Sequence, residues 1–530
     1  MIDRIFHRTK TQRHGVRRAG AGSYIPLCAF ASLRDIFCRN IFYFLFIILF
    51  LGIGNYNLLN LGAQGFGFGD YTEDDESGFG SNPASAPGIG DMVKISGNVN
   101  SELKFFFEDL GSFDKFKDTR LGDIFSGNLD FSVSGSAADA VISLKLAPVF
   151  DGSASPVSID EAYARAFFGP VNIEGGLRKL SWGRADSFGP LDLINPLDYR
   201  DLSALADPKS IKIARPMVHV SWNIGSFSKL EGVFVPWFQG HKFASEGRWA
   251  PSQITSMPDA VAGYMAAIPG FPAAHIPIIQ NKLIEAIHND GINQFYPDTA
   301  TLKYAQGGLR FTTSLGPSDF GLQYYFGRLP RPAMNISAEP GFYIYDPSSP
   351  TVNVDKLKLA DYNPYHHIGL DYAQVIAGFN IRAEAGANIT DDLDGKDGTV
   401  YNPAIVWSLG FDRDLFWGIN ANVQGAGSIR LFHDNINKNP LLDTEAGKET
   451  TSSRITLILS KKFFRDELEL KATGLWGIED RDFFIIPGVY WSRNSVSAEL
   501  SAGLFGGRRK GELGQYRDNG YFKIMLGYSF

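Results

Sequence analysis

The chain ends in the sequence Tyr521-Phe522-Lys523-Ile524-Met525-Leu526-Gly527-Tyr528-Ser529-Phe530. Large apolar side chains recur at every second position from Phe522 onward, and smaller or polar residues stand between them. A period of two is typical of a β-strand whose two faces meet different surroundings. The stretch therefore predicts a strand with one apolar face, either in a membrane-spanning barrel or in an ordinary β-sandwich.

The composition favours β-structure over helices. The 530 residues include 57 Gly and 42 Phe, and abundant glycine with aromatic residues is typical of sheets joined by many turns. The mean hydropathy of −0.09 excludes a polytopic helical membrane protein. It does not exclude a β-barrel, because only alternate residues of a barrel strand face lipid.

The N-terminal region has the features of an export signal. Basic residues dominate up to position 40, and residues 41–53 are uninterrupted apolar sequence. That length suits a signal-peptide core and is short for a membrane span. With a small-residue cleavage site at Leu61-Gly62-Ala63, residues 1–63 are predicted to be a signal peptide with a long basic leader. An uncleaved anchor and a start codon further downstream are the alternatives.

Residues 64–92 are predicted to form a flexible acidic periplasmic tail, because they are rich in Gly, Ser, Pro and acidic residues. Both cysteines, Cys28 and Cys38, precede this tail, so the mature chain has no disulfide and no thiolate metal site. The chain has 57 acidic and 50 basic residues, and the leader holds many of the basic ones. This balance argues against nucleic-acid binding.

Two-residue alternation recurs from Val93 to the C-terminus. In residues 378–388 and 496–504, for example, apolar residues alternate with small, polar or charged ones. A charged face beside a purely apolar face fits a water-filled lumen and a lipid surface. The charged residues predicted to line the lumen are Glu102, Lys104, Glu174, Arg310, Arg382, Glu384, Glu469 and Lys471.

The connections between the predicted strands alternate between short and long. Turns such as 169–170 and 412–414 separate long segments such as 181–214 and 239–300. Residues 93–530 are therefore predicted to form an all-β, transmembrane antiparallel up-and-down β-barrel of about 18 strands, with about 16 as the alternative. Apolar residues at helical spacing predict one helix, at 275–288, inside the longest loop.

The segment 181–200 is predicted to fold into the lumen and to set its selectivity. Its glycines and prolines restrict the backbone, and opposite charges that face each other across a narrow lumen polarise it. The predicted constriction residues are Trp182, Arg184, Asp186, Asp192, Asn195, Asp198, Tyr199 and Arg200. The alternative is a rigid cap whose charges pair with one another.

Short motifs between residues 160 and 250 carry a family resemblance. Glu161-Ala162-Tyr163, Ser181-Trp182-Gly183 and Asn195-Pro196-Leu197-Asp198 resemble the Glu-Ala-Tyr, Ser-Trp-Gly and Asn-Pro-x-Asp motifs of a porin-like family of bacterial outer-membrane β-barrels of unknown function. That family is similar in layout to alginate-export and carbohydrate-selective barrels. Leu177 departs from the family, which has Gly before Arg. The terminal Phe530 resembles the end of the closing strand of outer-membrane barrels, which implies recognition by the barrel-assembly machinery and a bacterial outer-membrane location.

No motif predicts an enzyme. The sequence has no Gly-x-Ser-x-Gly elbow, phosphate loop or His-Glu-x-x-His, so we expect no catalytic residue, cofactor or metal. The predicted function is a porin-like channel for the passive passage of small polar solutes, with the lipid bilayer as partner and the oligomeric state left open.

Two other functions stay open on the sequence alone. External loops could bind ligands or act as an adhesin, with the 239–300 loop closing the lumen. A barrel that transports hydrophobic solutes, such as fatty acids, would instead need a greasy pocket under the loops. Candidate residues for that pocket are Ile268, Phe271, Ile276 and Ile279.

Overall fold

The computed structural model describes residues 93–109, 124–147, 155–440 and 442–530. The predicted signal peptide (1–63) and acidic tail (64–92) lie outside these residues and stay predictions.

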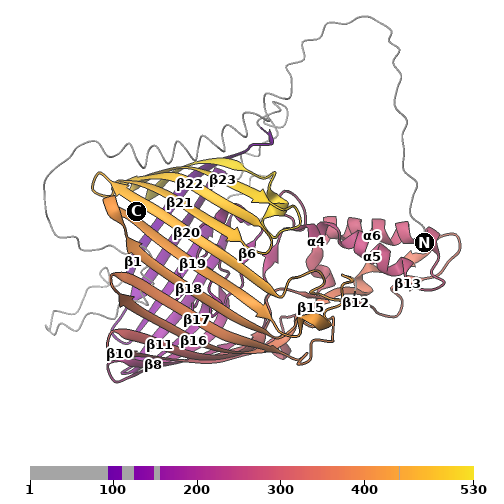
Figure 1. The fold of residues 1–530 in the computed structure, drawn as a ribbon, viewed down its shortest axis with the longest axis horizontal. Helices are drawn as coiled ribbons and strands as arrows, with labels where there is room; N and C mark the ends of the chain where they lie inside the picture. The colour runs from indigo at the N-terminus through magenta and orange to yellow at the C-terminus, as the bar shows by residue number, and fades with distance from the viewer. Residues whose placement is uncertain (1–92, 110–123, 148–154, 441) are drawn as a thin grey trace, which may run out of the picture. The chain divides into compact units, whose positions relative to one another are not determined.

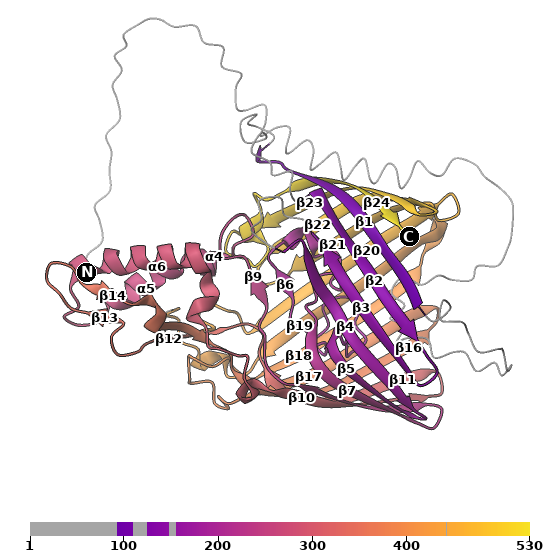
Figure 2. The same ribbon diagram turned by 180° about the vertical axis from the view of Figure 1, so that it is seen from behind.

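Eighteen antiparallel strands close into one barrel (Figures 1 and 2). Each strand pairs with the barrel strands before and after it, and β1 pairs with β24 to close the ring. The predicted all-β barrel of 18 strands is therefore confirmed. The strands are β1 (Val93–Phe106), β2 (Phe125–Ser134), β3 (Ala138–Leu146), β4 (Val157–Phe168), β5 (Val171–Arg178), β7 (Arg215–Ile224), β8 (Ser228–Val235), β10 (Gln306–Leu315), β11 (Ser318–Arg328), β16 (Pro364–Ile376), β17 (Phe379–Thr390), β18 (Ala404–Asp414), β19 (Ile419–Arg430), β20 (Thr451–Phe463), β21 (Leu468–Gly477), β22 (Asp482–Arg493), β23 (Val496–Gly507) and β24 (Tyr521–Ser529).

The C-terminal residues 521–530 form the seam of the barrel with β1. The register of β1 against β24 runs from Asn98 opposite Ser529 to Phe106 opposite Tyr521. Beyond the last strand residue, Gly97 and Phe530 exchange two backbone hydrogen bonds of 3.0 Å. The terminal residue is therefore part of the closed ladder.

Short turns join the strands at one end of the barrel, and mostly longer loops join them at the other; we call these the turn end and the loop end. The turn predicted at 412–414 is wrong, because β18 continues to Asp414 and the chain reverses at 415–418. Trp417 and Gly418 adopt positive φ there (63° and 67°). The sequence-based rule favoured the aspartates, whereas ladder pairing with β19 extends the strand through them.

Alternation sorts the side chains of each strand to the two faces of the wall. On β24, Leu526 and Tyr528 are exposed outside, whereas Lys523 points inward and lies 2.8 Å from Glu499 of β23. On β17, Glu384 is buried inside the barrel. Side chains that alternate along a strand thus produce an apolar exterior and a charged interior.

The two longest loops build a folded lobe at the loop end, with its own apolar core (Figure 1). Its helices are α4 (Ser252–Thr255), α5 (Met257–Ala266) and α6 (Ile276–Asp290), and its two-stranded sheets pair β12 (Ala333–Ala338) with β15 (Leu357–Asp361) and β13 (Tyr343–Ile344) with β14 (Thr351–Val352). The predicted helix at 275–288 is confirmed as α6. Among the described residues, no helix has the length and apolarity needed to cross a membrane.

Sequence reasoning missed α4 and α5, because both are short and carry little helical periodicity. Three of the residues proposed for a greasy pocket lie in or against the apolar core of the lobe. Ile279 is fully buried in that core, and Phe271 and Ile276 pack against it. These three side chains therefore support the lobe.

Candidate functional site

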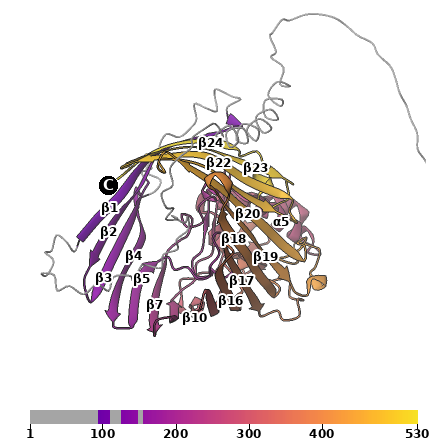
Figure 3. The same ribbon diagram turned by 60° about the vertical axis from the view of Figure 1, so that its left-hand side comes forward.

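The connection between β5 and β7, residues 179–214, lies inside the ring of strands (Figure 3). We call it the inner loop. It contacts the inner faces of strands on opposite sides of the barrel: β16, β17 and β19 on one side, and β1 and β24 on the other. It therefore spans the lumen.

Asn195 ties the two ends of the inner loop together. Its side-chain oxygen accepts a hydrogen bond from the Leu180 N–H (2.8 Å), and its amide nitrogen donates to the carbonyls of Arg178 (3.1 Å) and Ile213 (2.9 Å). The side chain is buried. Because an amide can both donate and accept, Asn195 links the outgoing and returning segments.

The tip of the inner loop is anchored on β16 and β17. Arg184 Nε donates to Asp371 Oδ1 at 2.7 Å. Glu384 accepts hydrogen bonds from the backbone N–H groups of Arg184 and Ala185, the latter at 2.8 Å. Gly183 adopts a φ of 93° directly before this contact, a conformation that favours glycine. Charge and backbone geometry together hold the tip on the wall.

The next residues of the tip reach toward the turn end. Asp186 forms an ion pair with Arg382 and accepts a hydrogen bond from Asn422 at 2.9 Å. Arg382 also lies 3.0 Å from Asp412. One arginine is therefore shared between a loop carboxylate and a wall carboxylate, only a few residues from the turn ends of β17 and β18.

The remaining predicted charges of the loop are paired within it. Lys212 forms an ion pair with Asp192 and donates to Ser181. Arg200 Nε donates to Asp198 at 2.9 Å, and 59% of the Arg200 side chain stays exposed. Arg200 is thus the most exposed of the predicted loop charges.

The second half of the inner loop crosses to the wall around the seam. Lys104 of β1 lies 3.0 Å from Asp201 and donates to Ser203 at 2.7 Å. Tyr521 of β24 donates to the Ser203 carbonyl at 3.2 Å. An apolar cluster joins the inner loop to the same wall and consolidates this contact: Leu202, Leu205 and Ile211 of the loop with Leu475, Phe484, Ile486, Phe505 and Tyr521 of the wall.

Trp182 anchors the first half of the loop by packing. Its indole is 3% exposed and meets the Tyr325 ring edge-on, with centroids 6.4 Å apart. Leu180 and Ile194 belong to the same buried cluster, together with Tyr365 of β16. Aromatic pairs in this geometry add to the free energy gained by burial, so Trp182 acts as a packing anchor.

At the loop end, residues 236–305, 329–363 and 508–520 contact the inner loop and one another; we call these three loops the cover. Tyr199 stacks on Phe243 with ring centroids 5.5 Å apart, and the Leu197 N–H donates to His241 Nδ1 at 2.9 Å. Glu512 lies 2.6 Å from Arg331 and also pairs with Arg454. These contacts tie together the inner loop and the loops that follow β8, β11 and β23.

Two titratable groups of this cover have shifted pKa values. Burial lowers the pKa of His241 to about 3. Burial would raise the pKa of Glu512, but the guanidinium groups of Arg331 and Arg454 outweigh it and hold that pKa well below its usual range. Both groups therefore keep their neutral-pH charge states over a wide pH range.

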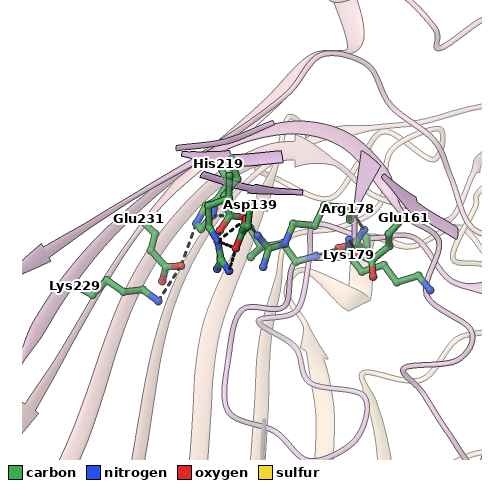
Figure 4. A network of polar contacts seen from close by, with 11 residues as sticks. Asp139, Glu161, Arg178, Lys179, His219, Lys229 and Glu231 are labelled. Carbon is green, nitrogen blue, oxygen red and sulfur yellow. Dashed lines mark hydrogen bonds and ion pairs between the residues drawn. The ribbon is translucent and has the colours of Figure 1, made fainter. Parts of the chain in front are cut away.

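The wall from β3 to β8 carries a continuous row of paired charges (Figure 4). Arg165 bridges Asp139 (2.8 Å) and Glu174 (3.7 Å). His219 stands between Glu174 (3.4 Å) and Glu231 (3.1 Å). Arg178 also pairs with Glu174, and Lys229 lies 3.6 Å from Glu231. Three cations thus face three carboxylates along this row, so it presents a polar surface with little net charge.

The structure places the predicted lumen residues on the inner wall but not in one cluster. Glu102 and Lys104 lie 3.2 Å apart near the seam. Glu469 and Lys471 sit on β21, where the register pairs them with Tyr490 and Gly488 of β22. Sequence reasoning missed Asp371, which the alternation of β16 would have placed inside. No sequence signal linked it to Arg184.

Within the described residues, no group of three or more His, Cys, Asp or Glu side chains is arranged to hold a metal ion. No protein-family model and no curated protein matches the sequence.

Solved structures show similarity in fold. Wzi, described as an outer membrane protein involved in group 1 capsule assembly in Escherichia coli and a carbohydrate-binding β-barrel, has 10% identity and a TM-score of 0.41, over 82% of this chain and 84% of that one. The outer membrane channel DcaP of Acinetobacter baumannii has 9% identity and a TM-score of 0.35 (83% and 97%). OccK9 of Pseudomonas aeruginosa has 10% identity and a TM-score of 0.41 (84% and 100%). These likenesses concern the fold alone.

Proposed function

We propose that the chain is a bacterial outer-membrane channel through which small polar solutes pass passively. The support for a membrane setting is the exterior of the barrel. Aromatic side chains are exposed near both ends of the wall, as in the belts that flank the lipid-facing band of membrane barrels. Phe168, Trp222 and Phe227 lie at the turn end, and Phe125, Phe234, Phe326 and Trp476 lie at the loop end.

The inner loop carries the channel proposal. It is anchored by ion pairs on one wall, through Arg184 and Asp371, and on the opposite wall, through Asp201 and Lys104. A loop held in this way narrows the lumen without depending on a conformational change. It acts as the constriction, and solutes pass beside it.

The charges around the constriction suggest the class of solute. Most charged side chains of the inner loop and of the β3–β8 wall have a partner of opposite sign. A lumen lined by such pairs offers hydrogen bonds without a strong net field. Small, hydrophilic solutes of low net charge suit it best.

Planar-bilayer recording and liposome swelling test this proposal. We expect discrete conductance steps from the purified protein and swelling with small sugars that declines as the sugar grows. A control variant lacking residues 184–192 should conduct more than the complete chain. A correctly folded protein that neither conducts nor admits sugars would overturn the proposal.

A second candidate function is ligand binding by the lobe at the loop end. The observation that favours it is the buried core of the lobe, which includes Val261, Leu283 and Phe295, because a loop that only connects strands needs no core of its own. Deleting residues 245–295 should abolish adhesion to host or matrix ligands if the lobe binds them. If the lobe instead obstructs the lumen, the same deletion should increase conductance.

A further inference from the structure

The outward-facing positions of the eighteen strands show an asymmetry of charge. These strands all belong to the described part of the chain, and their outward positions hold no Asp or Glu. They hold three cations at the turn end, Arg413 of β18, Lys461 of β20 and Arg493 of β22. At the loop end, Arg328 is already held by the Tyr362 carbonyl at 2.6 Å.

The three turn-end cations form a row. They occupy alternate strands, and each lies within the last three residues of its strand. Strands lie about 4.8 Å apart, so successive members of the row are separated laterally by roughly 10 Å. We call the wall that bears them the β18–β22 sector.

Aromatic rings support the cations in this sector. The Arg413 guanidinium lies 4.4 Å from the centre of the Phe379 ring, and Lys461 Nζ lies 5.0 Å from the centre of the Phe463 ring. Among the described residues, neither cation has a carboxylate partner. Arg493 is 3.6 Å from Glu467 and 64% exposed. Arg413 and Lys461 are therefore open to an anion on the outer face, whereas Arg493 is exposed but shares its charge with Glu467.

The rest of the turn end lacks such a row. Its outward side chains on the strands from β2 to β16 are apolar or uncharged, among them Val133, Phe168, Trp222, Leu315 and Ile376. A cation on an apolar wall is unfavourable in lipid unless its head reaches the interface and meets a counter-charge. Lipid phosphates are the anions present at that depth.

We infer that the β18–β22 sector binds the headgroups of anionic phospholipids, one phosphate lying between neighbouring cations of the row. This inference rests on the proposed membrane setting but not on channel activity. The row would give this side of the barrel a preferred lipid shell, while the uncharged side would accept any lipid.

Native mass spectrometry of the detergent-purified full chain tests the inference, with phosphatidylglycerol and phosphatidylcholine as probes. We expect the wild-type chain to retain phosphatidylglycerol at least about fivefold over phosphatidylcholine, and about 0.5 M salt to reduce this preference severalfold. The variant R413Q/K461Q/R493Q should bring the ratio close to one. The matched control K282Q/K396Q/R509Q removes three cations from the loops and should keep the preference.

An unchanged ratio in R413Q/K461Q/R493Q, or an equal loss in the control, would overturn the inference. A preference of the wild-type chain that does not change with salt would also overturn it. This test uses the wild-type chain alone and does not depend on the folding of any variant. The short turns of outer-membrane barrels face the periplasm, so the row would lie in the phospholipid leaflet. Retention of lipopolysaccharide in place of phosphatidylglycerol would also overturn the inference, since lipopolysaccharide belongs to the other leaflet. Conductance of the same preparations is read separately, so a failed channel proposal is distinguishable from a failed lipid site.

Discussion

Arg184 and Asp371 are 187 positions apart in the sequence, yet Arg184 Nε lies 2.7 Å from Asp371 Oδ1. The Asp371 side chain has no exposed surface, and its other oxygen lies 3.0 Å from Arg310 on the wall. One carboxylate thus balances a wall arginine and a loop arginine. The tip of the inner loop is anchored rather than free to swing.

Substituting Arg184→Ala should loosen the tip. It removes the ion pair with Asp371 but leaves the backbone hydrogen bonds to Glu384, and a lost charged hydrogen bond of this kind costs about 1–3 kcal/mol. We expect larger current fluctuations and a higher mean conductance in single-channel recordings. Lys396→Ala removes a cation from an exposed loop outside the lumen, where it pairs with Asp394; it is the control and should leave mean conductance unchanged. Identical traces for both variants would contradict an anchored tip.

Removing one charge at a time from the inner loop should shift ion selectivity in opposite directions. Asp186→Ala leaves Arg382 with only Asp412 nearby, so the channel should become more selective for anions. The reversal potential in a salt gradient measures this change. Arg200→Ala exposes the Asp198 carboxylate and should make the channel more selective for cations, with a shift of the reversal potential in the opposite direction. Reversal potentials that do not move for either variant would show that solutes pass without sensing this loop.

Acidification should weaken the cover at the loop end. His241 accepts the Leu197 N–H and is neutral in the fold with a pKa of about 3, whereas an unfolded histidine titrates near 6.5. Its folded pKa is depressed, so its contribution to stability is complete above about pH 6.5 and falls as the pH drops from about 6.5 to 3, by at most about 1.4 kcal/mol per pH unit. After correction for the intrinsic exchange rate, which itself falls with pH, the protection factors of the amides in residues 195–200 should therefore decrease between pH 7.5 and about pH 5.

The matched control for this pH effect is His241→Gln, whose side chain still offers an acceptor but does not titrate. Glu512 and Arg331, the charged neighbours of His241, do not change charge in this window, because the pKa of Glu512 is held well below its usual range. Equal pH dependence in both proteins would assign the effect to another group.

The seam should be sensitive to Gly97. A Cβ at Gly97 would lie 2.5 Å from the Asn128 carbonyl oxygen and 3.0 Å from the Phe530 ring, so Gly97→Ala must displace one of them at a cost of about 1–3 kcal/mol. We expect the folded form to convert to the unfolded form at a lower temperature on a heat-modifiability gel. Gly175→Ala adds its methyl group to open space and should behave like the wild-type chain.

Much of the barrel was predictable because its signals are local. The alternation in 378–388 and in the C-terminal stretch assigns each side chain to a face without knowledge of its partners. The spacing of the turns predicts the number of strands. Apolar residues at helical spacing predict α6. The misplaced turn at 412–414 shows the limit, because pairing with β19 overrode the local preference of aspartate for turns.

The candidate site was predictable only in part. The sequence singled out 181–200 by its mixture of charges, aromatics and prolines, but it did not show which charges pair inside the loop and which reach a wall. Asp192 and Asp198 pair locally with Lys212 and Arg200, whereas Arg184 and Asp186 find partners almost 200 residues away. Those partners follow from closure of the ring and from the depth to which the loop descends.

The sequence by itself determined the class of architecture, the strand order and the two faces of the wall, because period-two patterning and turn spacing act over a few residues. Only the tertiary structure decided that the inner loop bridges opposite walls, that Asp371 and Glu384 receive its tip, and that three cations line up outside β18, β20 and β22. Each of these depends on register across strands, which sets the spatial neighbours of residues that are distant in the chain.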